Sequence, residues 1–181
     1  HVRCAAVHKL ASKVLQLEQA VLSKGKFDAE LADLRHACGS DDVVATIIHT
    51  VPRDSAARGV PSKREIDTLF RTAYDEVYAA ALVKPGNDTL GGRVMSKVMS
   101  LIIAPPGSGA IGDSPEAILA RADAALEDAR LEVAVTEMEK LQGLHKEMAD
   151  DWLAVARKRL VAEQAVTNLR AYVTSLAREL E

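Results

Sequence analysis

Apolar side chains recur at spacings of three and four residues through most of this sequence, and no other feature limits the fold as strongly. This periodicity is typical of helices that bury one face. In the first segment its members are Val7, Leu10, Ala11, Val14, Leu17 and Val21. Aromatic residues make up only 3% of the chain, and the sequence lacks the alternating β-branched and aromatic runs that strands favour. The sequence therefore predicts an all-α protein.

Helix-capping residues and breakers divide the first half of the chain into helices. Asp41 and Asp42 precede an apolar run and predict a helix start, and Pro52 predicts the end of that helix. Ser62 and Glu65 form a capping box that predicts a longer helix. The helical segments expected in this half are 2–23, 27–38, 43–51, 63–82 and 90–103.

The second half is expected to form a small helical bundle after the linker PPGSG at residues 105–109. This linker is the predicted boundary between a region over 1–103 and a region over 111–181. Pro115 opens the first helix of the bundle, and Gly143 is expected to end the second. The expected segments are 115–126, 131–141 after a turn near 128–130, and a long helix over about 148–180.

Charge and motifs exclude several classes of function. Residues 111–181 carry a net charge of −5, whereas nucleic-acid binders present a strong basic face. The five histidines are dispersed, and no metal-binding, phosphate-binding or nucleophile motif is present. We therefore expect no enzyme activity, no catalytic residues, no metal and no cofactor.

The two cysteines leave two alternatives open. Cys4 and Cys38 lie in helical patterns, and the favoured interpretation is that they are small buried apolar residues. A disulfide between them is the other alternative. The sequence has no apolar run of 18 residues, and it begins at His1 without a signal pattern. We therefore expect any targeting or anchoring segment to lie upstream.

Short motifs in a fixed order make the chain resemble the C-terminal region of the mitofilin family. In that order, and over nearly the whole chain, they are LSKGKFDAEL at 22–31, DDVV at 41–44, TVP at 50–52, AARGVPS at 56–62, ALVKP at 81–85, DWLAVAR at 151–157 and QA at 164–165. The chain departs from the family pattern in two places. The usual Arg-Phe pair is replaced by Leu69-Phe70, with Arg71 after it, and a usual Gly-Asp-Leu break reads Ala129-Arg130-Leu131.

The resemblance implies a structural protein that organises crista junctions of the mitochondrial inner membrane. It implies amphipathic helices followed by a C-terminal bundle that docks the CHCH-domain subunit of the MICOS complex. It implies self-association as a homodimer or higher oligomer, contact with anionic, cardiolipin-like lipid, and a position facing the intermembrane space. An alphaproteobacterial inner membrane, periplasmic side, is the alternative location. On this basis residues 1–103 are assigned to self-association and lipid contact, and residues 111–181 to partner docking.

Two segments are candidates for lipid contact. Residues 90–103 are apolar except for two cations on one face, which is the pattern of an interfacial helix. The resemblance places a lipid-binding helix near Phe70 and Arg71. The predicted lipid-binding residues are Phe70, Arg71, Arg93, Val94, Lys97, Val98 and Ile102. The alternative for both segments is packing within the bundle or against a partner.

Trp152 is the only tryptophan and the first candidate for partner docking, with Leu153 and Leu160 beside it. Its alternative role is an apolar anchor inside the bundle. The rival function for the whole chain is a soluble helical scaffold of a large membrane complex that binds no lipid.

Overall fold

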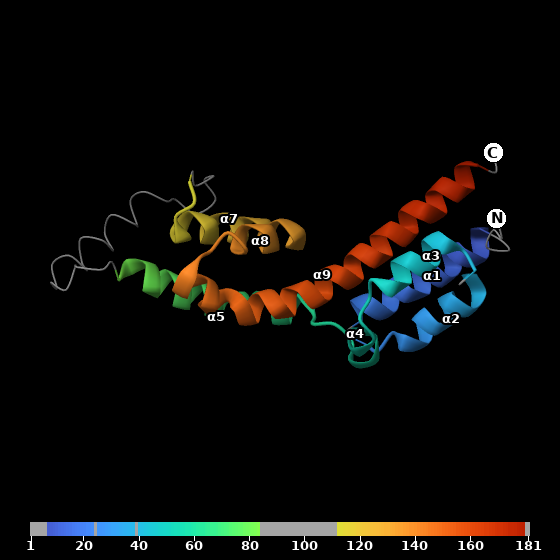
Figure 1. The fold of residues 1–181 in the computed structure, drawn as a ribbon, viewed down its shortest axis with the longest axis horizontal. Coiled ribbons are helices and arrows are strands. Elements are labelled where there is room, and N and C mark those ends of the chain that lie inside the picture. Colours follow the sequence, from blue (N-terminus) through green and yellow to red (C-terminus); the bar gives the residue numbers. More distant parts are fainter. Residues whose placement is uncertain (1–6, 24, 39, 84–111, 180–181) are drawn as a thin grey trace. The chain divides into compact units, whose positions relative to one another are not determined.

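The structure is a computed structural model that describes residues 7–23, 25–38, 40–83 and 112–179, and every regular element in these ranges is a helix (Figure 1). The helices are α1 (Val7–Leu22), α2 (Asp28–Cys38), α3 (Asp42–His49), α4 (Arg53–Arg58), α5 (Lys63–Leu82), α7 (Pro115–Glu127), α8 (Leu131–Met138) and α9 (Gly143–Arg178). The prediction of an all-α protein is confirmed. The expected helix over 90–103 lies outside the described residues.

The chain forms two compact units that divide it differently from the linker at 105–109. Unit 1 comprises residues 1–62 and 158–181, and unit 2 comprises residues 63–157. Helix α9 therefore contributes its first half to unit 2 and its second half to unit 1. The assignment of self-association and lipid contact to 1–103, and of docking to 111–181, stays a prediction about roles.

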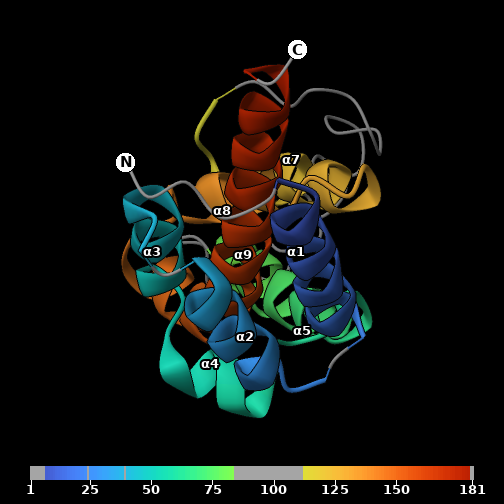
Figure 2. The ribbon, with the colours of Figure 1, turned by 90° about the vertical axis from the view of Figure 1, so that its right-hand side faces the viewer.

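Unit 1 is built around one buried face of α1, whose Leu10, Val14, Leu17 and Val21 are at most 2% exposed. Figure 2 shows α1, α2 and α3 grouped with α4. These positions follow the spacing of three and four that predicted the helix. The rest of the core consists of Phe27, Leu31, Leu34, Cys38, Val44, Ile48, Val51, Ala56, Val60, Ala162, Ala165, Val166 and Leu169.

The short helix α3 begins where its acidic residues predict. The side chain of Asp41 accepts hydrogen bonds from the backbone N–H groups of Val43 and Val44, at 2.9 and 3.3 Å, and so satisfies two free donors at the helix start.

Helix α4 was not predicted. Pro52 precedes it as an N-cap residue, so the proline that ends one helix also starts the next.

Polar side chains on α9 form hydrogen bonds with the loops of unit 1. The hydroxyl of Tyr172 donates to the second carboxylate oxygen of Asp41 at 2.6 Å. Arg159 is only 8% exposed, and its guanidinium donates to the carbonyl of Pro61 at 3.0 Å and to Glu163 at 2.6 Å. A buried cation needs such partners, because an unpaired buried charge is strongly destabilising.

Cys38, the last residue of α2, is 1% exposed and disulfide-bonded. The burial agrees with the interpretation that the sequence favoured. The bond shows that this buried side chain is not a free thiol, which the sequence had left open. The only other cysteine of the sequence, Cys4, lies outside the described residues.

Unit 2 is centred on Trp152 and Phe70, which are each 1% exposed. Their ring centroids lie 5.3 Å apart at an interplanar angle of 64°, an edge-to-face arrangement. The indole N–H of Trp152 donates to the carbonyl of Ile66 at 3.1 Å, so the buried polar atom of the ring has a partner. Trp152 therefore joins the first half of α9 to α5.

The turn predicted near 128–130 is present between α7 and α8. Ala129 adopts a positive φ of 57°, and the N–H of Arg130 donates to the carbonyl of Ala125 at 2.8 Å. The expectation that Gly143 ends the returning helix is wrong. Helix α8 already ends at Met138, and Gly143, with a positive φ of 57°, begins α9.

The cap at Asp41 gives a test of the unit 1 fold. Asp41→Ala removes the acceptor of two backbone N–H groups and of the Tyr172 hydroxyl, so we expect the free energy of unfolding to fall by about 2 kcal/mol. Urea denaturation followed by circular dichroism measures this change. Asp42→Ala is the matched control, since Asp42 is exposed and should lose less than about 1 kcal/mol. Equal losses would contradict the capping role.

Candidate docking and lipid-contact sites

The predicted lipid-binding residues fall into two groups in the sequence, and the structure describes only one of them. Arg93, Val94, Lys97, Val98 and Ile102 lie outside the described residues. Phe70 and Arg71 are neighbours on α5, where Phe70 points into the core of unit 2 and Arg71 is exposed. Lipid contact by any of them remains a prediction.

Arg71 already has an anionic partner. Its guanidinium donates to both carboxylate oxygens of Asp123 on α7, at 2.6 and 3.2 Å, and lies 5.8 Å from the centre of the Phe70 ring. The hydrogen bonds that Arg71 donates to Asp123 stabilise the charged guanidinium and raise the pKa of Arg71 above its ordinary value. A lipid phosphate could bind this guanidinium only by competing with Asp123.

A row of aromatic rings extends along α5 from Trp152. Phe70 packs edge-on against Tyr74 at 6.0 Å, and Tyr74 stacks on Tyr78 at 6.0 Å. Burial, assisted by Asp123, raises the pKa of the Tyr74 hydroxyl. The spacing of four residues between these rings is visible in the sequence, but the sequence analysis assigned no role to Tyr74 or Tyr78.

The predicted partner-binding residues do not meet in one unit. Trp152 and Leu153 are fully buried in unit 2, whereas Leu160 is half-buried and belongs to unit 1. Burial of Trp152 agrees with its alternative role as an anchor inside the bundle. Partner docking by Trp152 stays a prediction.

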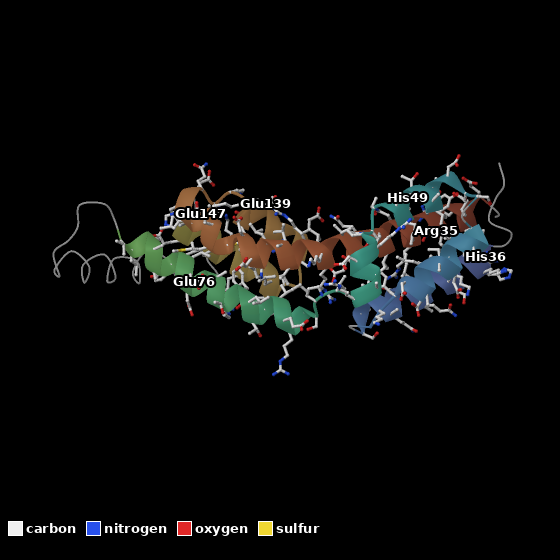
Figure 3. The ribbon with its side chains drawn as sticks, turned by 60° about the horizontal axis from the view of Figure 1, so that its bottom comes forward. Arg35, His36, His49, Glu76, Glu139 and Glu147 are labelled. Atoms are coloured by element: carbon white, nitrogen blue, oxygen red, sulfur yellow. The ribbon has the colours of Figure 1, made fainter. Side chains whose placement is uncertain are left out.

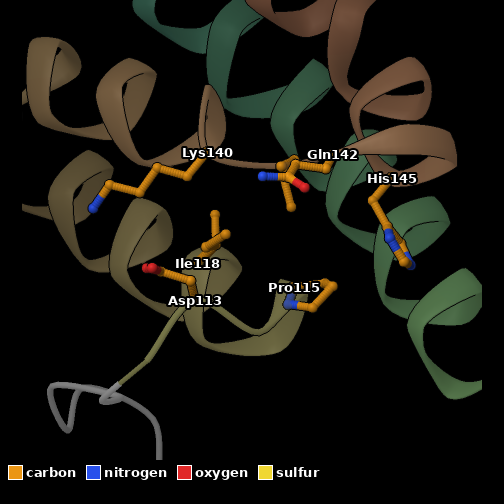
Figure 4. Close-up of a pocket in the computed structure, with 7 residues that line it drawn as sticks. Asp113, Pro115, Ile118, Lys140, Gln142 and His145 are labelled. Carbon is orange, nitrogen blue, oxygen red and sulfur yellow. The ribbon is translucent and has the colours of Figure 1, made fainter.

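Unit 2 carries a hollow of about 580 Å³ (Figure 4). Residues from the start of α7, the loop after α8 and the first turn of α9 form its walls. They are Asp113, Pro115, Ile118, Lys140, Leu141, Gln142 and His145. Ile118 and Leu141 are buried and form an apolar floor, while Asp113, Lys140 and Gln142 are exposed at the rim. The sequence suggests a partner groove shaped by Leu153, Leu160 and the apolar positions at 118–126, and of these only Ile118 lines the hollow.

A network of ion pairs holds the rim of the hollow. Arg121 on α7 donates to Glu137 on α8 at 2.9 Å and to the carbonyl of Gly112 at 2.6 Å. Glu137 also pairs with Lys140 at 3.0 Å. Arg121 lies 3.5 Å from the carboxylate of Asp113. The network fixes the start of α7 and the end of α8, the two segments between which the hollow opens.

Glu137 is the electrostatic centre of this network. Burial would raise the pKa of its carboxyl, but hydrogen bonds from Lys140 and Arg121 outweigh burial and hold the pKa below its ordinary 4.5. A depressed pKa stabilises the folded state above pH 4.5, and this contribution is lost as the pH falls through the folded-state pKa.

Glu137→Gln tests this network. At pH 7 we expect the variant to unfold with a free energy about 1 kcal/mol below that of the wild type, because the charged acceptor is gone. The difference should shrink as the pH falls through the folded-state pKa, which lies below the ordinary 4.5, because the wild-type carboxyl then becomes protonated. Denaturant unfolding at both pH values measures it. Glu132→Gln, an exposed change on the same helix, should show no such pH dependence.

Charge is concentrated in unit 2. Residues 63–83 and 112–157 hold fifteen acidic and eight basic side chains. Glu76 on α5, Glu139 on the loop after α8 and Glu147 on α9 are labelled in Figure 3, and all three are exposed. Residues 84–111, by contrast, contain three basic residues and one acidic residue.

Neither a metal centre nor a bilayer-crossing helix is found in the described residues. No group of three or more His, Cys, Asp or Glu side chains within them could hold a metal ion. None of their helices is both long and apolar enough to cross a bilayer. The fold places the chain in the class of all-α proteins, and the sites that its described residues offer are a hollow and charged helix surfaces.

Comparison with known proteins identifies the family within this class. Residues 4–174 match the Mitofilin family, described as a mitochondrial inner membrane protein. The chain belongs to the Mitofilin family, as its motifs indicated. No solved structure matches it.

Its curated relatives include fungal proteins named MICOS complex subunit MIC60. The chain is 35% identical to that of Pyrenophora tritici-repentis over 150 residues, which cover 83% of this chain and 23% of the relative. It is 34% identical to that of Phaeosphaeria nodorum over 140 residues, covering 77% and 22%. It is 33% identical to that of Talaromyces marneffei over 150 residues, covering 83% and 23%. The chain thus spans less than a quarter of their length.

Proposed function

We propose that this chain is the docking and membrane-contact region of a MICOS-type organiser that shapes or holds crista junctions at the mitochondrial inner membrane. The observation that carries the proposal is the family match over residues 4–174, together with relatives that are themselves named as MICOS subunits. The proposed partners are a CHCH-domain subunit, further copies of the chain, and anionic, cardiolipin-like lipid. No catalytic step is part of the role.

The hollow of unit 2 is the proposed docking site for the CHCH-domain partner. Its volume is within the range of binding pockets, and it combines a buried apolar floor with a polar rim, as in the centres of protein interfaces. Leu144 lies beside it in the first turn of α9 and is 57% exposed. An apolar side chain from a partner helix could enter the hollow while polar groups contact the rim.

The uneven distribution of charge supports the assignment of docking and lipid contact to different segments of the chain. The excess of acidic side chains in unit 2 disfavours its approach to an anionic bilayer, because like charges repel. Residues 84–111 carry the cations that such a surface attracts, worth about 1 kcal/mol each. We therefore assign docking to unit 2 and lipid contact first to the segment with Arg93 and Lys97.

Docking is tested by substitutions of Gln142 at the rim and of the half-buried His145, which also lines the hollow. The double variant Gln142→Glu and His145→Glu should bind a purified CHCH-domain MICOS subunit at least about tenfold more weakly, because it changes the charge and shape of the rim without touching the buried floor. Isothermal titration calorimetry measures the dissociation constant.

The matched control for docking lies in unit 1. Gln164→Glu changes an exposed glutamine on the other half of α9 and should leave the dissociation constant unchanged. If the rim variant binds as tightly as the wild type, the hollow is not the docking site.

Phe70 and Arg71 need a different test from Arg93 and Lys97. Phe70 is fully buried against Trp152, so its insertion into lipid would require α5 to leave the core of unit 2. A charged substitution of Phe70 would unfold the unit and weaken lipid binding for that reason alone. Lipid contact at Phe70 and Arg71 therefore belongs to a second, opened state in this proposal.

Lipid contact is tested by flotation with vesicles that contain cardiolipin. The wild-type chain should float with the vesicles, and Arg93→Glu with Lys97→Glu should reduce the bound fraction several-fold, because both cations become anions. Lys63→Glu with Arg64→Glu makes the same charge change at exposed positions on α5 and should float like the wild type. A wild-type chain that stays at the bottom of the gradient would favour the rival, a helical scaffold without lipid binding.

The disulfide at Cys38 supports a position on the intermembrane-space side. Disulfides persist in oxidising compartments and are rare where glutathione keeps thiols reduced. The same argument applies to the periplasmic side of an alphaproteobacterial inner membrane. It disfavours the matrix and the bacterial cytoplasm.

A further inference from the structure

We propose that the rim of the hollow in unit 2 selects its partner by charge, and that it binds an apolar side chain accompanied by an acidic group facing Lys140 and a basic group facing Asp113. The inference rests on the proposed docking function and names the chemistry of the partner surface. Both charged residues line the hollow together with the buried Ile118 (Figure 4). The occupant is therefore a partner segment with charges of both signs, and not a uniformly basic one.

Four charges of alternating sign form a chain along the rim. In order they are Asp113, Arg121, Glu137 and Lys140, and the nitrogen–oxygen distances between neighbours are 3.5, 2.9 and 3.0 Å. The two inner charges, Arg121 and Glu137, join α7 to α8, and Arg121 also donates to the carbonyl of Gly112. The inner charges therefore stabilise the fold of unit 2.

The two outer charges, Asp113 and Lys140, differ from the inner ones in exposure. The side chains of Asp113 and Lys140 are 80% and 43% exposed, whereas those of Arg121 and Glu137 are 23% and 13% exposed. If Lys140 turns toward another carboxylate, Glu137 keeps Arg121 as its partner. If Asp113 turns toward another cation, Arg121 keeps Glu137. A partner can therefore engage both outer charges without leaving a sheltered charge unpaired.

The outer charges also retain bonding capacity within the chain of ion pairs. The nitrogen of Lys140 lies 3.0 and 3.1 Å from the two carboxylate oxygens of Glu137, and an ammonium group carries three hydrogens. Glu137 accepts at most two of them, and we assign the remaining one to a partner carboxylate. The carboxylate of Asp113 lies 3.5 Å from Arg121, which is longer than a charge-assisted hydrogen bond, so a partner cation can bind it more closely.

Exposed charges of this kind contribute more to selection than to affinity. Solvent and salt screen them, so the apolar floor of Ile118 and Leu141 supplies most of the affinity. A partner group of the wrong sign facing Lys140 or Asp113 adds repulsion. The rim therefore rejects apolar segments whose flanking charges are reversed.

Titration calorimetry with a purified CHCH-domain MICOS subunit tests the charge selection. The double variant Lys140→Met with Asp113→Asn removes one charge of each sign, so unit 2 keeps its net charge, and we expect the dissociation constant to rise about fivefold. Lys146→Met with Asp150→Asn is the matched control, because it removes a lysine–aspartate pair of α9, 3.8 Å apart, that lies outside the lining of the hollow. An unchanged constant in the rim variant, or an equal rise in the control, would overturn the inference.

Two single reversals separate this selection from a general attraction between acidic unit 2 and a basic partner. Lys140→Glu makes unit 2 more acidic, and Asp113→Lys makes it less acidic. We expect both to weaken binding, because each places a like charge before one group of the partner. Tighter binding by Lys140→Glu together with weaker binding by Asp113→Lys would show that net charge governs docking and would refute the selection. Circular dichroism verifies that each variant is folded.

Failure of this inference is distinct from failure of the proposed function. If the wild-type chain binds the subunit and the rim variants bind equally well, docking stands and the charge selection is refuted. If the wild-type chain does not bind the subunit, the docking function is refuted and the charge selection with it.

Discussion

The fold of this chain depends on one long helix whose two halves complete two different cores. Helix α9 has 36 residues, with Ala149, Trp152, Leu153 and Ala156 buried in unit 2. Farther along, Ala162, Ala165, Val166 and Leu169 are buried in unit 1. Neither α1–α4 nor α5, α7 and α8 have a complete core without their part of α9. Alanine at four of these eight positions lets the neighbouring helices approach the α9 backbone closely, which suits a chain with few aromatic residues.

A core this poor in rings has to obtain its specificity from polar contacts. In unit 1 the buried Asp41 and Arg159 are each satisfied by a partner on the opposite segment, so only one register of α9 fulfils both. A buried Asp41 or Arg159 without its partner would destabilise the fold by more than the intact hydrogen bond stabilises it. In unit 2 the indole N–H of Trp152 has the same role, because it must reach the carbonyl of Ile66.

The sequence predicted what local chemistry decides. Asp41 and Ser114 accept hydrogen bonds from nearby backbone N–H groups, so their helix starts could be read from a few neighbouring residues. The units could not be predicted, because α9 returns to residues more than a hundred positions earlier in the chain, as in the pair of Arg170 and Glu18. Most of the lining of the hollow in unit 2 was missed for the same reason. Its floor joins Ile118 of α7 to Leu141 of the loop after α8, and no short motif encodes that contact.

Phe70 shows why an apolar stripe alone cannot distinguish a core from a membrane-facing surface. Removing its ring from water contributes about 2 kcal/mol whether the new surroundings are lipid tails or other side chains. The difference comes from Trp152, whose ring and N–H offer Phe70 and α5 a directional site that lipid cannot offer. Lipid contact by α5 must therefore compete with this site. A protein that both docks subunits and touches a membrane can in this way keep the two tasks on different segments of one chain.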